Sequence, residues 1–163
     1  MRHRRRGRPT LGPGSCHQRC RSDVLTGFGN EDAYIATLVA EYSPRVKDAV
    51  AFARQRRVLL LKSSEGVELD VSLGALPFEQ LVVQRASTFM PEPGLELRTC
   101  SAEDLIVLKL FASRPLDIRD AETVVIRHGK ELDWHYIEEK LQPLADAKEA
   151  PEIMTTLAKL GGE

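Results

Sequence analysis

Residues 99–125, TCSAEDLIVLKLFASRPLDIRDAETVV, decide how this chain is organised, because they predict two helices joined by a short turn. Ser101 is placed to cap the first helix, and Asp104, three residues on, would close a variant capping box. From residue 105 to residue 112 every side chain is apolar except Lys109. A helix so apolar on all sides is normally buried. The Lys109 ammonium therefore needs a carboxylate partner or a route to water.

The second predicted helix offers such partners. Asp117 and Asp120 lie three residues apart and share one helical face, with Arg119 beside them. Two interpretations stay open. A lysine held by packing and faced by carboxylates positions a cation for a phosphate group. A lysine at the edge of a core also simply extends its charge into water, with no ligand involved.

A second stretch with candidate functional residues is GVELDVSLG, residues 66–74, in which apolar and polar residues alternate. Such a period of two predicts a strand on which Glu68 and Asp70 point the same way, roughly 7 Å apart. Two acids on one strand face attract a divalent cation, although oxygen-ligand sites usually need more partners. The alternative is a solvated strand face, which is common in alternating strands.

Three stretches together resemble the nucleotidyltransferase-fold proteins of the AbiEii toxin type. Glu103-Asp104-Leu105 with Lys109, followed by Arg114 and Arg119-Asp120, is similar to the C-terminal signature of that family. The stretches LTGFG (25–29), GVELDVSLGALPFE (66–79) and LRTCSAEDLIVLK (97–109) are similar to one branch of it and occur in the family's order. The resemblance covers residues 25–157.

The resemblance implies Mg²⁺-dependent transfer of a nucleotidyl group from an NTP to an RNA or protein acceptor, in the toxins to tRNA ends. It implies that Asp70 binds metal, with Glu68 beside it as a second candidate ligand. It also implies that Lys109 and Arg114 face the nucleotide phosphates and that Asp120 orients Lys109 or the nucleophile. A cognate antitoxin is a further expected partner.

One part of the family pattern is missing. The family begins with Gly-Gly or Gly-Ser followed by a strand bearing Asp-x-Asp, which supplies the first two metal carboxylates. Aligning LTGFG with the family places those carboxylates near Arg19 and Arg21, and arginine does not ligate magnesium. We therefore expect transfer to be crippled. The alternatives are an inactive fragment and a module that binds nucleic acid or a protein partner.

Residues 1–22 differ in composition from the rest of the chain. Residues 1–21 hold seven arginines and no acid, and the remainder holds 16 Lys and Arg against 24 acids. A segment so poor in large apolar residues is expected not to pack as part of a domain. Three hypotheses remain: a nucleic-acid-binding arm, a metal site at Cys16, His17 and Cys20, and a wrong-frame or wrong-start segment. The folded domain is expected at residues 23–163.

The expected fold is α/β, with a small mixed sheet, flanking helices and a helical C-terminal half. The predicted strands are residues 24–26, Val58–Lys62, residues 67–73 and Leu95–Thr99. Residues 77–85 are predicted to form a helix that opens with a proline, and residues 90–94 a proline-rich loop. The three cysteines form no disulfide framework, and no apolar run reaches the length of about 18 residues that a membrane helix requires. We expect a cytoplasmic protein with no membrane partner.

Overall fold

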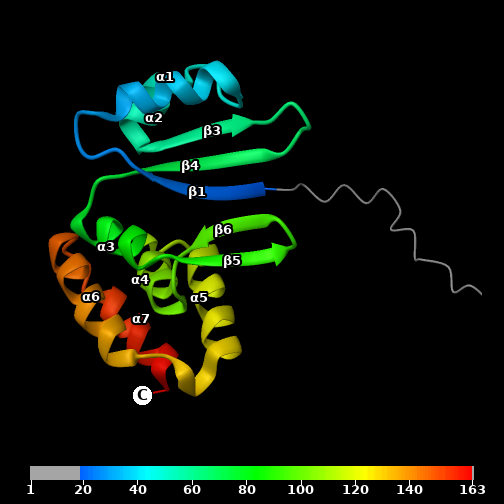
Figure 1. Cartoon of the computed structure of the whole chain (residues 1–163). Helices are drawn as coiled ribbons and strands as arrows, with labels where there is room; N and C mark the ends of the chain where they lie inside the picture. The colour runs from blue at the N-terminus through cyan, green and yellow to red at the C-terminus, as the bar shows by residue number, and fades with distance from the viewer. Residues whose placement is uncertain (1–18, 163) are drawn as a thin grey trace, which may run out of the picture. The chain divides into compact units, whose positions relative to one another are not determined.

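The computed structural model describes residues 19–162 and has a mixed α/β fold, as the sequence predicted (Figure 1). The chain divides between Ala75 and Leu76 into two compact units. Most of the predicted segment 1–22 lies outside the described residues. Its last four residues belong to a strand, so the expectation that residues 19–22 stay outside the fold is wrong.

The first unit contains a four-stranded sheet. Its strands are β1 (Arg19–Leu25), β2 (Ser43–Pro44), β3 (Val58–Lys62) and β4 (Glu68–Gly74), in the spatial order β1-β4-β3-β2. Strand β1 runs parallel to β4, whereas β3 runs antiparallel to both of its neighbours, β4 and β2. The sheet is therefore mixed, as predicted.

Two helices, α1 (Glu31–Glu41) and α2 (Ala49–Arg56), cover one face of this sheet (Figure 1). The apolar run of β3 and the alternation of β4 explain which face is covered, because successive strand residues point to opposite sides. The core between helices and sheet comprises Ile35, Ala49, Ala53, Leu59, Leu61, Val71 and Leu73. The opposite face carries the charged side chains of β1 and β4.

The second unit is mostly helical. It contains α3 (Pro77–Arg85), α4 (Ala102–Ala112), α5 (Pro115–His128), a 3₁₀ turn (Gly129–Glu131), α6 (Trp134–Ala147) and α7 (Glu152–Gly161). Helix α4 lies at the centre of its core, with Ile106, Val107 and Leu110 almost wholly buried. This confirms the prediction that the apolar helix around Lys109 is buried.

A hairpin in the second unit corrects two sequence expectations. Strand β6 (Leu95–Thr99) has the predicted bounds, but it pairs with β5 (Ser87–Glu92) in a separate two-stranded sheet. Residues 90–94 had been predicted as a proline-rich loop, whereas Met90 and Pro91 lie within β5. Both strands of the hairpin are exposed along their whole length.

Within residues 19–162 the structure contains no helix with the length and apolar character needed to cross a membrane.

Candidate functional site

Lys109 lies at the junction of α4 and α5. Helix α4 ends at Ala112, the next residue, Ser113, adopts the left-handed conformation, and α5 begins at Pro115. This short turn brings the two helices into contact. Nζ of Lys109 donates hydrogen bonds to Oδ1 of Asp117 at 3.0 Å and to Oδ2 of Asp120 at 2.6 Å. The predicted pairing of Lys109 with these two carboxylates is confirmed.

Asp117 is the buried centre of this charge network. Its side chain is only 3% exposed, and its second oxygen accepts a hydrogen bond from Nε of Arg114, whose own side chain is largely exposed. Burial by itself raises the pKa of the Asp117 carboxyl, but the hydrogen bonds from Arg114 and Lys109 outweigh it, so the net pKa lies below its ordinary value. The network of Lys109, Arg114, Asp117 and Asp120 carries two positive and two negative charges, so it is electrically neutral.

Because the network is neutral, it has little net attraction for an anion such as a phosphate group. The Lys109 side chain is 15% exposed and its ammonium already has two carboxylate partners. A phosphate group that approaches Lys109 must therefore replace a carboxylate, and Asp120, whose side chain is 55% exposed, is the one that is free to turn away. Arg114 is the more accessible cation.

A second buried carboxylate, Asp104, was singled out by the sequence only as a capping residue and as part of the family signature. Asp104 is completely buried in α4 and accepts hydrogen bonds from the Tyr136 hydroxyl at 2.6 Å and from Nε of Arg85 at 3.3 Å. The Arg85 guanidinium also lies over the Tyr136 ring, 4.3 Å from its centroid. Burial, then the hydrogen bond to Asp104, raises the pKa of the Tyr136 hydroxyl far above its usual value.

The capping prediction is therefore only half right. Ser101 caps α4, because its hydroxyl accepts a hydrogen bond from the Asp104 amide at 3.1 Å. The Asp104 carboxylate, however, does not return to the helix terminus and instead joins α4 to α3 and α6. No local pattern indicates a contact between residues 32 positions apart, so sequence alone gave no sign of it.

The two acids of β4 point the same way, as predicted, but two arginines hold them. Nη1 of Arg45 donates to Oε2 of Glu68 at 3.0 Å, and its Nη2 is hydrogen-bonded to Oδ1 of Asp70. Arg19 donates to Glu68 at 2.9 Å and lies 3.8 Å from Asp70. The Arg45 Nε bonds the carbonyl of Leu61, which fixes this guanidinium on the sheet.

These residues do not fit the magnesium ion that the family resemblance implies. The strand register places Arg19 beside Glu68 and Arg21 beside Asp70, so the neighbouring strand offers guanidinium groups where further carboxylates are needed. A guanidinium has no lone pair to give a metal. No cluster of three or more acidic, histidine or cysteine side chains suited to a metal occurs in residues 19–162.

Another arginine outside the predicted site ties the loop after β1 to the sheet. Arg57, in the left-handed conformation at the end of α2, donates to the carbonyls of Leu73 and Gly27 and to the Thr26 hydroxyl, at 2.8 to 3.0 Å. It also pairs with Glu31 at 3.4 Å. The loop is thus held by structural contacts, and the acids that open α1 disfavour an anion there.

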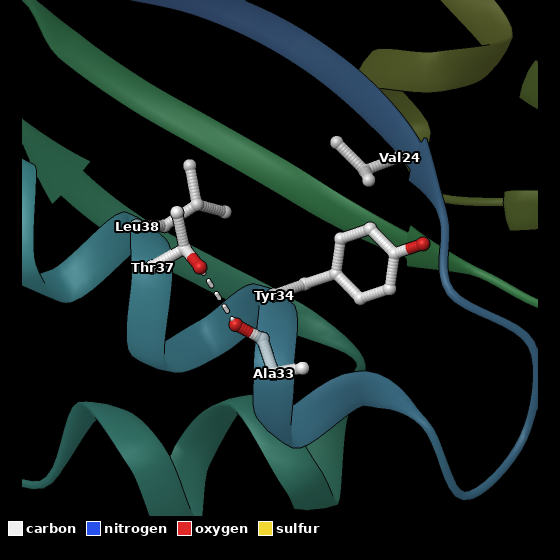
Figure 2. Close-up of a pocket in the computed structure, with 5 residues that line it drawn as sticks. All are labelled: Val24, Ala33, Tyr34, Thr37 and Leu38. Carbon is white, nitrogen blue, oxygen red and sulfur yellow. Dashed lines mark hydrogen bonds between the residues drawn. The ribbon is translucent and has the colours of Figure 1, made fainter.

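An apolar groove of about 350 Å³ lies between α1 and β1. Its lining residues are Val24, Ala33, Tyr34, Thr37 and Leu38 (Figure 2). The Thr37 hydroxyl donates to the Ala33 carbonyl at 2.9 Å, so it is occupied within its own helix. The groove therefore has the chemistry of a contact surface for apolar groups and lacks the charges that a nucleotide requires.

Neither a scan of protein-family models nor a search of curated proteins finds a match for this chain. The likeness to nucleotidyltransferases rests on the residues quoted from the sequence, and their roles in nucleotide, metal or acceptor binding stay predictions.

Proposed function

We propose that this chain is a nucleotidyltransferase-like protein in which metal-dependent nucleotidyl transfer is lost. The observation that carries the proposal is the pairing of Glu68 and Asp70 with Arg45 and Arg19. The family reaction requires carboxylates that hold divalent metal ions against the triphosphate. Here the same strand face is already neutralised by side chains of the chain itself.

Displacement of the arginines by Mg²⁺ is unfavourable for two reasons. Mg²⁺ gives up its bound water reluctantly and usually binds through more than one carboxylate together with phosphate oxygens. In addition, Arg45 is only 17% exposed and is anchored through a third hydrogen bond to Leu61, so removing it from Glu68 and Asp70 breaks a partly buried network.

The nucleotide half of the proposal concerns Lys109 and Arg114. Lys109 lies in the last turn of α4 and Arg114 directly precedes α5, which supports their use in phosphate binding, but the two aspartates compete with any phosphate. We therefore expect weak triphosphate binding without turnover. Asp120 is the residue whose movement would expose Lys109, consistent with the orienting role that the resemblance implies for it.

The test is a labelling assay with each of the four NTPs, Mg²⁺ or Mn²⁺, and mixed tRNA and protein acceptors. The expected result is no transfer above that of Asp70→Ala. A matched double variant, Arg19→Asp with Arg21→Asp, places carboxylates at the two β1 positions beside Glu68 and Asp70 and should bind Mn²⁺ measurably in a calorimetric titration. Robust labelling by the native chain that disappears in Asp70→Ala would falsify the proposal.

A second candidate is a module that binds nucleic acid, such as tRNA, or a protein partner such as an antitoxin, through the arginine-rich N-terminal segment. The structure refines its test, because residues from Arg19 onward belong to β1. Deletion of residues 2–18 leaves that strand intact, whereas deletion through residue 22 removes four of its seven residues. Loss of RNA binding in the shorter deletion, with the fold preserved, supports this candidate.

A further inference from the structure

Strand β1 forms one edge of the four-stranded sheet. Within the described residues its only strand partner is β4. An exposed edge presents unpaired backbone donors and acceptors and is a ready template for another strand. β1 is seven residues long, which is long enough for a regular ladder.

The direction of each backbone group along β1 follows from the hydrogen bonds at its end. The amide of Thr26 donates to the carbonyl of Gly74 on the β4 side at 2.9 Å. Because successive residues of a strand bond to opposite sides, the alternate residues Cys20, Ser22 and Val24 also bond toward β4. The backbone groups of Arg19, Arg21, Asp23 and Leu25 therefore point to the open edge.

The sequence of β1, RCRSDVL, is self-complementary when read against a second copy in the antiparallel direction. With a two-fold axis at Ser22, Arg21 lies opposite Asp23 of the second copy, and Asp23 lies opposite Arg21 of the second copy. Both residues point their backbone groups outward, so each such pair exchanges two hydrogen bonds.

Other registers are disfavoured by charge. An axis at Arg21 places this arginine opposite itself, and an axis at Asp23 does the same with the aspartate. Like charges directly opposite each other are destabilising on a sheet. A two-fold axis that passes between two residues sets a residue whose backbone groups point to the open edge opposite one whose backbone groups point toward β4. Such a register forms no regular hydrogen-bond ladder. The axis at Ser22 pairs all seven residues of the strand, sets outward-pointing backbone groups opposite each other and places Arg21 opposite Asp23.

The side chains support the same register. Asp23 is exposed and has no ion-pair partner among residues 19–162, so an arginine from a second copy gives it one. On the helix-covered face, Cys20 of the second copy lies opposite Val24, which lines the apolar groove beside Tyr34 (Figure 2). The second copy thus covers exposed apolar surface on one face and completes ion pairs on the other.

We propose that β1 is a homodimerisation strand, which pairs antiparallel with β1 of a second copy about a two-fold axis at Ser22. The dimer contains one continuous eight-stranded sheet, four strands from each chain. A closed two-fold contact of this kind also covers the open edge of β1, and the opposite edge, β2, is only two residues long and includes a proline.

Sedimentation equilibrium of the full chain tests the proposal. The expected mass is 36.4 kDa, twice the 18.2 kDa of one chain. Arg21→Asp and Asp23→Arg each create like-charge pairs and should weaken association by roughly 30-fold or more. The double variant Arg21→Asp/Asp23→Arg restores opposite charges and should restore the dimer. Circular dichroism confirms that each variant is folded.

Oxidative crosslinking supplies a second measurement that does not depend on charge. Directly opposed residues in a non-hydrogen-bonded antiparallel pair have Cα atoms about 4.5 Å apart, which suits a disulfide. Ser22→Cys should therefore yield a covalent dimer. The native chain is the control, because its Cys20 lies four positions, or about 13 Å, from Cys20 of the second copy. A monomeric native chain, or a folded double variant that stays monomeric, overturns the proposal, as does a Ser22→Cys chain that crosslinks no better than the native one.

Discussion

Replacing Lys109 with methionine removes the ammonium that joins α4 to α5 while keeping most of the side-chain volume. In the native chain this ammonium bonds the buried Asp117 at 3.0 Å and the exposed Asp120 at 2.6 Å. After the substitution, Asp117 loses this charge partner but keeps its hydrogen bond from Arg114, whose side chain is 68% exposed. The variant is expected to destabilise the second unit.

The magnitude follows from the burial of each partner. Removing one member of a fully buried pair costs about 3–5 kcal/mol, and an exposed pair contributes about 0–1 kcal/mol. Asp120 belongs to the exposed class. Asp117 belongs to the buried class but keeps its hydrogen bond from Arg114, and methionine packs well against the apolar residues of α4. We therefore expect a loss of about 2 kcal/mol in the free energy of unfolding.

Trp134 makes the assay specific, because it is the single tryptophan of the chain and lies in α6 of the same unit. Urea unfolding followed by its fluorescence reports the stability of that unit. The matched control is Asp120→Asn, which should change stability by less than about 1 kcal/mol. Two results together would contradict this reasoning: a Lys109→Met variant as stable as the native chain, and no change in the stability of either protein on adding millimolar ATP or CTP with Mg²⁺. Lys109 would then be a lysine that extends its charge into water and binds no ligand.

The same pair predicts a pH dependence. Because the folded-state pKa of Asp117 is lowered, its contribution to stability is present above the unfolded-state pKa of about 3.9 and is lost as the pH falls through the folded-state pKa. The stability difference between the native chain and Lys109→Met should therefore narrow below about pH 4. Unfolding curves between pH 3 and pH 7 measure it.

Two further substitutions test the other charge networks. Tyr136→Phe removes a hydrogen bond to the fully buried Asp104 and should lower the free energy of unfolding by about 2 kcal/mol, as measured by urea unfolding with Trp134 fluorescence. In alkaline absorbance titrations of the native chain, one of the three tyrosines should stay protonated well above pH 10 until the second unit unfolds. Arg45→Met removes the guanidinium that bridges Glu68 and Asp70, so hydrogen exchange of the amides in β3 and β4 should quicken, and millimolar Mg²⁺ should slow it again. If the hydrogen-exchange rates of Arg45→Met are the same with and without Mg²⁺, Glu68 and Asp70 do not bind the ion even when Arg45 is absent.

Much of the secondary structure could be predicted because its causes are local. The apolar run of Val58–Lys62, the proline that opens α3 and the serine that caps α4 each act within a few residues, and the elements they mark have the expected bounds or begin where expected. The pairing of Lys109 with Asp117 and Asp120 was also accessible, because only one turn separates the two helices that carry them.

The sequence by itself thus determined the α/β class, the buried helix around Lys109 and the shared direction of Glu68 and Asp70. Tertiary structure alone decided that β1 begins at Arg19, because a polar strand forms only where another strand supplies hydrogen bonds, and here β4 lies 49 residues away. It likewise decided the partners of Asp104 and of the two β4 acids. A charged side chain is satisfied by whichever opposite charge the folded chain brings within reach, and that distance is set by packing between elements far apart in sequence.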